Sequence, residues 1–141
     1  MKIEFSAVAS NEALARSAIA SFASVLNPSI DQIIELKTAV SEAVTNSIVH
    51  AYKGKDGTVS VKAHIIGNQL HICVSDRGCG IPNITQALEP FYTSCPEYER
   101  SGMGFCIMKS FMDSVCVYSK VGKGTRIKMI KTVGVNDESS N

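Results

Sequence analysis

ICVSDRGCGI, residues 72–81, is the stretch on which the predicted fold depends. Its first five residues predict a strand that ends at Asp76, and the turn that follows contains Gly78 and Gly80. A second glycine cluster, RSGMGF at residues 100–105, opens an apolar stretch with helical spacing. Glycine lets the backbone approach a ligand closely, and a glycine loop before a helix presents free N–H groups to an anion. The two clusters therefore predict a site that holds a flat base at one end and phosphates at the other.

The composition is that of one globular domain. The chain has 141 residues and a formal net charge of +1, so its bulk charge gives no reason to expect direct binding to nucleic acid or to a membrane surface. The five cysteines are scattered without a C-x-x-C pair, and we interpret them as buried thiols of a cytoplasmic protein. No signal peptide and no membrane-spanning apolar stretch is apparent. We expect a single domain over 1–132 and a polar, disordered tail over 133–141.

Residues 2–8 alternate as a strand, and a first helix follows that Ser10 or Asn11 can cap. Its predicted apolar stripe consists of Ala13, Leu14, Ala18, Phe22, Val25 and Leu26. A second helix, capped by Ser29 or Asp31, is expected to run to about Tyr52. The apolar stripe of this second helix consists of Ile33, Leu36, Val40, Ala43, Val44 and Ile48.

Beside that second stripe lies a polar line, Glu42, Asn46 and His50. Residues four apart rotate by only about 40° on an α-helix, so the three are expected on one side. A carboxylate so near the core should be paired or chemically active, because burying an unpaired charge is costly. Taken singly, Glu42 and Asn46 are better explained as a surface or capping glutamate and a hydrogen-bonded asparagine.

The C-terminal half predicts two strand pairs around a lid and a helix. Residues 58–66 and 70–76 form a hairpin with His64 and His71 on its exposed side, and the proline-broken segment 82–101 is interpreted as a lid. A helix over 103–112 follows, and strands over 114–119 and 125–132 are joined by a turn at 121–124.

This order of elements resembles the ATP-binding fold shared by gyrase, Hsp90, histidine kinases and MutL. The resemblance implies an α/β, two-layer (α+β) sandwich of the Bergerat type, with a mixed, mostly antiparallel sheet and helices on one face. Within that superfamily, SEAVTNSIVH at 41–50 and the stretch from Glu97 through RSGMGF resemble the sporulation anti-sigma F factors, a family of bacterial anti-sigma factors and serine-protein kinases.

The resemblance implies a role for each site residue. Glu42 would be the general base that takes a proton from the attacking hydroxyl, and Asn46 would bind Mg²⁺ through its amide oxygen. Asp76 would accept the adenine amino proton. The remaining nucleotide contacts would come from Gly78, Gly80 and Thr125 around the base and from Arg100, Ser101, Gly102, Met103 and Gly104 around the phosphates. Whether Arg100 serves the γ-phosphate or a partner is left open.

The resemblance also implies partners. The family binds a sigma factor of the sigma F type, phosphorylates a serine of an anti-anti-sigma factor with Mg-ATP, and forms a homodimer. ATP would favour the sigma complex, and ADP the complex with the unphosphorylated antagonist. The residues alone favour a solvated cation at Arg16, whereas the resemblance implies that it lies on the partner surface. Cys95 departs from the family, which commonly carries lysine there, so a contact from that position to the phosphates is in doubt.

Three alternatives remain. The catalytic domain of a histidine kinase would need a helical hairpin with a phosphoacceptor histidine, and we expect none before residue 2. An ATP-gated clamp, in which Glu42 would activate water, would need a second domain. A sigma-factor trap without catalysis is disfavoured because Glu42 and Asn46 are both present.

Overall fold

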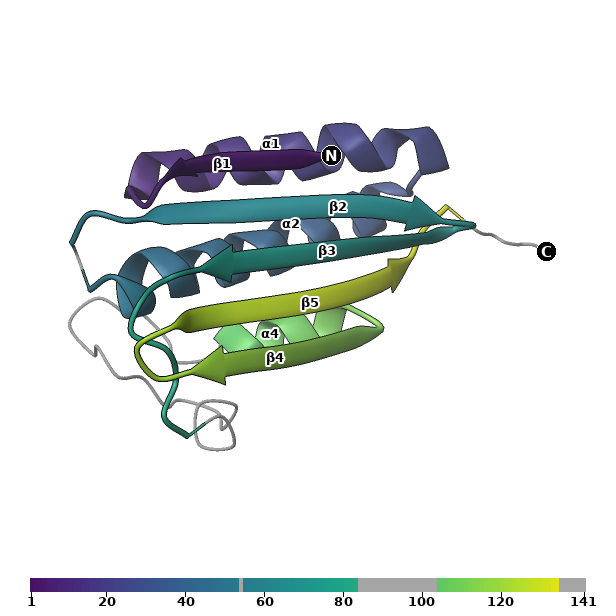
Figure 1. The fold of residues 1–141 in the computed structure, drawn as a ribbon. Helices are drawn as coiled ribbons and strands as arrows, with labels where there is room; N and C mark the ends of the chain where they lie inside the picture. The colour runs from purple at the N-terminus through teal and green to yellow at the C-terminus, as the bar shows by residue number, and fades with distance from the viewer. Residues whose placement is uncertain (54, 84–103, 135–141) are drawn as a thin grey trace.

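The computed structural model describes residues 1–53, 55–83 and 104–134, and it has two layers (Figure 1). The strands are β1 (Lys2–Ser6), β2 (Thr58–Ile66), β3 (Gln69–Asp76), β4 (Ser114–Lys120) and β5 (Gly124–Thr132). They form one sheet in the order β1-β2-β3-β5-β4. The helices α1 (Glu12–Ala23), α2 (Ile30–Thr45) and α4 (Gly104–Phe111) cover one face of this sheet (Figure 1). The expected two-layer sandwich is confirmed. All four strand pairings in the described part are antiparallel, where a mixed sheet was expected.

The core lies between the sheet and the helices. Alternate residues of each central strand point toward the helices, and on β2 and β3 these positions are fully buried at Val59, Val61, Leu70, Ile72 and Val74. The predicted β2–β3 hairpin is therefore confirmed together with the face that it presents to the core, and the predicted β4–β5 pair is confirmed as a pairing.

The predicted apolar stripe of α1 is only partly confirmed, because Phe22 and Leu26 pack against the core but Leu14 and Val25 do not. The buried residues of α1 are Ala15, Ile19 and Ala23, whereas Leu14 and Val25, which were expected in the core, are 51% and 70% exposed. The helix carries apolar residues on more than one side, and the alanines allow the closest approach to its neighbour α2. Asn11 is the N-cap residue as predicted, but its side chain makes no capping hydrogen bond to the helix. It donates instead to the carbonyl of Ser6 (2.9 Å), and a short 3₁₀ turn (Ala9–Asn11) precedes the helix.

Helix α2 begins as predicted. The Ser29 hydroxyl accepts from the backbone N–H of Gln32 (3.1 Å), and the Gln32 side chain accepts from the N–H of Ser29 (3.0 Å), which is a capping box. Its predicted stripe is buried at Leu36, Val40, Ala43 and Val44. The expectation of one α-helix up to Tyr52 is wrong, because residues Asn46–Ala51 form a π-helix, named η3. The polar line of Glu42, Asn46 and His50 therefore does not keep the spacing of an α-helix.

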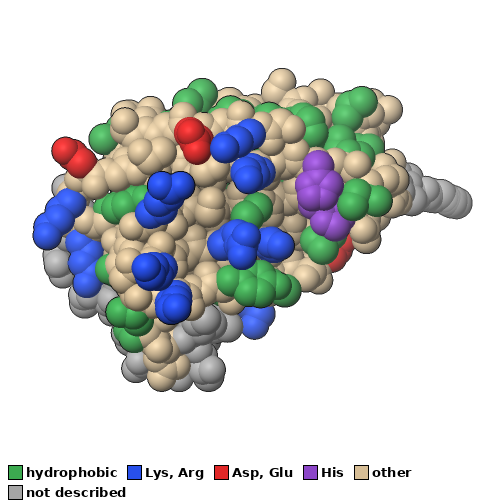
Figure 2. Space-filling model, in the orientation of Figure 1, with side chains coloured by type: hydrophobic (Ala, Val, Ile, Leu, Met, Phe, Trp, Pro, Cys, Tyr) green, Lys and Arg blue, Asp and Glu red, His purple; other side chains and the backbone are tan. Residues whose placement is uncertain are grey.

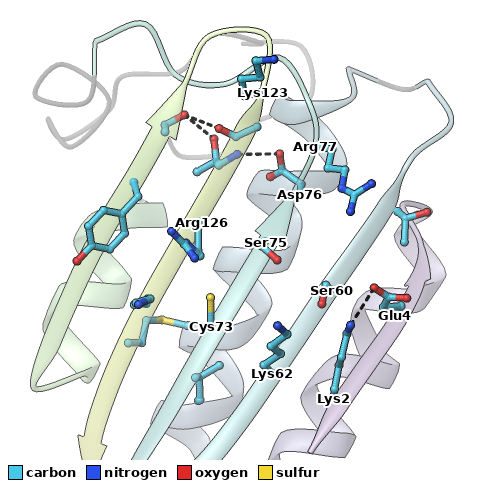
Figure 3. Close-up of a pocket in the computed structure, with 18 of the residues that line it drawn as sticks. Lys2, Glu4, Ser60, Lys62, Cys73, Ser75, Asp76, Arg77, Lys123 and Arg126 are labelled. Carbon is cyan, nitrogen blue, oxygen red and sulfur yellow. Dashed lines mark hydrogen bonds and ion pairs between the residues drawn. The ribbon is translucent and has the colours of Figure 1, made fainter.

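The opposite face of the sheet is open and cationic (Figure 2). A shallow hollow runs along it (Figure 3), and its basic lining residues are Lys2, Lys62, Arg77, Lys120, Lys123, Arg126 and Lys128. His64 and His71 stack on each other with ring centroids 4.8 Å apart; His64 is exposed as predicted and His71 is half-buried. In the described ranges, no helix is both long enough and apolar enough to cross a membrane.

The expectation of buried cysteines is wrong. Cys79 and Cys116 are exposed, and Cys73 and Cys106 are half-buried. Within the described residues no second layer covers the open face of the sheet, so the thiols of Cys73 and Cys116 on that face stay accessible. Cys95, most of the predicted lid and the residues from 135 onward lie outside the described part of the chain.

Candidate functional site

Asp76 is the last residue of β3, and its side chain lies on the helix-covered side of the sheet (Figure 3). Its residue is only 8% exposed. One carboxylate oxygen, Oδ1, accepts from the backbone N–H of Gly78 (2.9 Å) and of Thr125 (3.2 Å). The other, Oδ2, accepts from the hydroxyl of Ser47 (2.8 Å). Three separate segments of the chain therefore converge on this carboxylate.

The environment of Asp76 makes it a strong and oriented acceptor. Burial raises the pKa of its carboxyl above the ordinary value for aspartate, and the hydrogen bonds from Gly78, Ser47 and Thr125 oppose that rise. Each carboxylate oxygen has two lone pairs, and the described residues show two donors on Oδ1 and one on Oδ2. One acceptor position on Oδ2 therefore remains for a ligand N–H.

The glycines around Asp76 allow backbone segments to lie unusually close. A Cβ on Gly78 would collide with the carbonyl of Ala51 at the end of the π-helix. Gly124 has φ +118 and lies against the carbonyl of Asp76, a conformation that favours glycine. Gly80 packs in the same manner against the backbone of Lys120. The turn after β3 is therefore packed against both η3 and the β4–β5 connection.

Hydrogen bonds hold the same turn in place. The N–H of Cys79 donates to the carbonyl of Ala51 (2.9 Å). The Tyr52 hydroxyl donates to the carbonyl of Thr58 (2.7 Å) and accepts from the N–H of Arg77 (2.8 Å). On the other side, the Ser119 hydroxyl accepts from the N–H of Ile81 (2.7 Å).

Three residues of this network were not singled out from the sequence as functional. Ser47 and Tyr52 lie in or next to the π-helix, and their roles depend on its i to i+5 hydrogen bonding, as between the N–H of Tyr52 and the carbonyl of Ser47 (3.3 Å). Ser119 is within 2.8 Å of the Thr125 hydroxyl. In the sequence, the one sign of a role for Ser47 was that a polar residue stands where the helical spacing predicts a buried one. The structure shows that Ser47 is 1% exposed.

Glu42 and Asn46 lie on the same side of the sheet as Asp76. Asn46 directly precedes Ser47, which binds Asp76, and Glu42 is four residues earlier on α2. A Cβ placed on Gly104, the first residue of α4, would lie 3.2 Å from Oε1 of Glu42. The structure therefore places Glu42 beside the start of α4, and it joins the residue after Asn46 to Asp76 through the hydroxyl of Ser47.

Other predicted site residues lie apart or outside. Arg100, Ser101, Gly102 and Met103 are outside the described residues. Arg16 is on α1, which takes no part in the contacts above, and its Nε lies 2.6 Å from Oε2 of Glu12 one helical turn earlier.

The hollow on the open face is distinct from this site. Asp76 and Thr125 border its end, but the lining comes mainly from outward-facing residues such as Ser60, Lys62, Cys73 and Ser75, and Glu42 and Asn46 are not part of it. The candidate site is therefore the region on the helix-covered side of the sheet where α2, η3 and the start of α4 lie near the end of β3.

Comparisons with known proteins agree with this geometry. Residues 5–131 match the family described as "Histidine kinase-like ATPase domain". An anti-sigma F factor of Clostridium kluyveri is 53% identical over 131 residues, which cover 93% of this chain and 92% of the relative. Anti-sigma F factors of Anoxybacillus flavithermus and Caldanaerobacter subterraneus subsp. tengcongensis are 47% and 46% identical over 132 and 136 residues, covering 93% and 96% of this chain and 90% and 95% of the relatives.

Among solved structures, the mycobacterial sensor histidine kinase MprB superposes with a TM-score of 0.58 at 24% identity and covers 72% of each chain. The catalytic domain of the histidine kinase ThkA gives the same TM-score at 16% identity and covers 72% of this chain and 68% of that one. At these identities the likeness concerns the fold alone. The chain belongs to the histidine kinase-like ATPase domain family and, within it, to the family of the anti-sigma F factors.

Proposed function

We propose that this chain is an anti-sigma factor and a serine-protein kinase: it binds a sigma factor of the sigma F type and uses Mg-ATP to phosphorylate a serine of an anti-anti-sigma factor. The observation that carries the ATP-binding half of the proposal is the buried Asp76 carboxylate, which three donors orient while leaving an acceptor position free. The anti-sigma half rests on the similarity, at about half identity, to anti-sigma F factors over most of the chain.

Asp76 is suited to read adenine. A fixed carboxylate oxygen can accept a hydrogen bond from the exocyclic amino group of adenine. Guanine carries a carbonyl at the equivalent position, and this oxygen would repel the carboxylate because both groups are acceptors. The tight packing of Gly78 against Ala51 and of Gly80 against Lys120 fixes the turn that follows Asp76. Thr125, which is 5% exposed, borders the same place.

The other end of the site fits a metal-bound triphosphate. Asn46 offers an uncharged amide oxygen, a hard donor of the kind that Mg²⁺ accepts beside phosphate oxygens. Gly104 begins α4, so N–H groups at this helix start are available to anions. When bound, Mg²⁺ would neutralise phosphate charge.

Glu42 is the proposed general base. Its carboxylate lies beside the start of α4, where the terminal phosphate and an approaching serine hydroxyl would meet. A general base of this kind contributes about 10²–10⁴-fold in rate. The remaining acceleration comes from alignment and charge neutralisation, since a loose phosphoryl transition state requires little covalent help.

The partner side of the proposal rests on the family. A homodimer of the chain would hold the sigma factor in the cytoplasm with ATP bound, and would hold the unphosphorylated antagonist with ADP bound. Such a switch requires that each partner have a different affinity for the two nucleotide states. Arg16 on α1 is the proposed contact residue on that partner surface.

The test uses the purified full chain, ATP labelled in the γ-phosphate, and the candidate antagonist. Label on a single antagonist serine, lost when that serine is changed to alanine, supports the kinase. Label on a histidine of the chain itself, or release of all label as inorganic phosphate, would overturn it. Co-elution of the sigma factor with the chain in ATP, and its release by the antagonist in ADP, tests the anti-sigma role separately.

A further inference from the structure

Lys131 is a lysine inside the apolar layer between sheet and helices. It lies on the helix-facing side of β5, in the same alternation as Ile127 and Met129, and only 7% of the residue is exposed. Lysine is almost never this deeply buried without a partner, because its charge loses hydration. Its contacts therefore need an explanation.

The ammonium group of Lys131 joins two helices. Its Nζ donates to the backbone carbonyl of Phe111 (2.5 Å), the last residue of α4, and lies 2.9 Å from Oε1 of Glu35 on α2. The carbonyls in the last turn of a helix have no partner within the helix, and a cation at that end also complements the helix dipole. The same ammonium group of Lys131 thus pairs with the Glu35 carboxylate and donates a hydrogen bond to a carbonyl that has no partner within α4.

This bridge and the candidate site lie at opposite ends of the same helix pair. Glu35 is seven residues before Glu42 on α2, and Phe111 is seven residues after Gly104 on α4, about 10 Å of helix in each case. Glu42 lies beside Gly104, and Lys131 joins Glu35 to Phe111. Two contacts of equal spacing therefore set the antiparallel register of α2 and α4, which both lie behind the sheet in Figure 1.

The end of α4 has further anchors to β5, but none of them reaches α2. The N–H of Asp113 donates to the carbonyl of Ile130 (2.9 Å), and the Asp113 carboxylate accepts from the N–H of Thr132 (2.7 Å). These bonds fix α4 on the sheet. Two polar contacts of the described residues link β5 or its C-terminal end to α2: the ion pair between Lys131 and Glu35, and the hydrogen bond from the N–H of Gly134 to the side chain of Gln32 (3.1 Å) in the first turn of α2. Lys131 also reaches the last residue of α4, so its contacts join the end of α4 directly to the helix bearing Glu42.

We propose that Lys131 is a positioning residue for the phosphate end of the nucleotide site, acting through Glu35 and Phe111 to hold the start of α4 against Glu42. The inference rests on the proposed nucleotide site and goes beyond it. The inference predicts different effects on the two parts of the nucleotide. Adenine would bind at Asp76, which Lys131 does not contact, whereas the phosphates would bind at the start of α4. Loss of the bridge should therefore weaken ATP and leave adenosine unaffected.

The test variant is Lys131→Met, which keeps the length and apolar stem of the side chain. Removing one partner of a buried ion pair destabilises a protein by leaving the other charge unpaired; here the Glu35 side chain is 35% exposed and can be hydrated, which limits that loss. Lys128→Met is the matched control, because Lys128 is on the same strand but faces the open side of the sheet. Both variants remove one positive charge.

Affinities for ATP and adenosine are measured by NMR titration of the full chain, which reaches millimolar dissociation constants. We expect Lys131→Met to weaken ATP about tenfold, the size of one lost charged hydrogen bond, with adenosine unchanged and Lys128→Met like the wild type. An unchanged ratio of ATP to adenosine affinity in Lys131→Met would overturn the inference, even if its melting temperature falls. If Lys131→Met does not fold, Glu35→Gln, which keeps the bond to Phe111, must show the same selective loss.

The outcome also distinguishes this inference from the proposed function. A wild-type chain that binds neither ATP nor adenosine overturns the proposed function and the inference with it. A wild-type chain that binds both, with a variant that keeps the wild-type ratio, overturns only the role of Lys131.

Discussion

The hydroxyl of Ser47 donates a 2.8 Å hydrogen bond to the carboxylate of Asp76, two buried residues that are 29 positions apart. This bond joins the π-helix after α2 to the end of β3. Because Asn46 directly precedes Ser47, the same bond places the proposed metal ligand on the side of the sheet where the proposed adenine acceptor lies. Together with the bond from the N–H of Cys79 to the carbonyl of Ala51, it fixes the π-helix against the end of β3.

Asp76→Asn should impair adenine nucleotides selectively. Asparagine keeps one carbonyl oxygen for the N–H groups of Gly78 and Thr125, but presents an NH₂ group where Oδ2 stood. A lost hydrogen bond to a charged group weakens binding by about 10- to 100-fold. Titration calorimetry with ATP and GTP measures this change; equal losses for both nucleotides would remove Asp76 from base reading.

The same variant should change how stability depends on pH. Because burial raises the pKa of Asp76 above its value in the unfolded chain, the folded protein holds this proton to higher pH. The stabilisation is fully present below the unfolded pKa and is lost as pH rises through the folded pKa. Chemical denaturation from pH 3 to 7 should show a wild-type loss of stability across that window that Asp76→Asn lacks. Parallel curves for the two proteins would contradict the raised pKa.

Glu42→Ala should retain ATP binding and lose phosphate transfer. Removal of a general base lowers the rate by about 10²–10⁴-fold while the contacts at Asp76 remain. Single-turnover transfer to the antagonist serine, measured beside nucleotide affinity, separates the two effects. Glu4→Ala serves as control, since Glu4 is exposed on β1 and pairs with the exposed Lys2 far from α4. Unchanged transfer in Glu42→Ala would exclude Glu42 as the base.

Gly124→Ala should destabilise the fold far more than Gly122→Ala. Both glycines have positive φ, but a Cβ on Gly124 meets the backbone of Asp76, whereas nothing lies within 4 Å of one on Gly122. We expect about 1 kcal/mol at Gly122 from backbone strain alone and about 3 kcal/mol or more at Gly124. Urea denaturation of both variants measures the difference. Equal losses of unfolding free energy in the two variants would mean that the start of β5 does not pack tightly against the backbone of Asp76.

Arg16→Ala should impair the complex with the sigma factor or the antagonist and leave nucleotide affinity unchanged. Arg16 pairs with Glu12 across one turn of α1, and their side chains are 39% and 22% exposed. Ion pairs near the surface add little to stability, so a large folding defect is not expected. Glu12→Ala is the matched variant, because it breaks the same ion pair but leaves the guanidinium free to bind. A normal complex of Arg16→Ala on a sizing column would return Arg16 to the role of a solvated cation.

The chain's own patterns were sufficient for most of the fold. Alternation over β2 and β3, the capping box at Ser29 and Gln32, and glycines after Asp76 and before α4 are local features, since each depends on residues a few positions apart. These patterns predicted the hairpins, the covered face of the sheet and the identities of Glu42, Asn46 and Asp76 as candidates.

The tertiary structure decided the rest, because the deciding contacts join residues far apart in the chain. Which apolar side of α1 is buried depends on the surface against which the helix packs. For that reason Ile19 is buried and Leu14 is exposed. The change from α-helix to π-helix at Asn46 allows Ser47 to meet Asp76. Lys131 shares the inward alternation of Ile127 and Met129, but its partners Glu35 and Phe111 are found only when β5 is placed against α2 and α4. Local sequence determines what each segment prefers, but the meeting of two segments depends on the free energy of packing the whole domain.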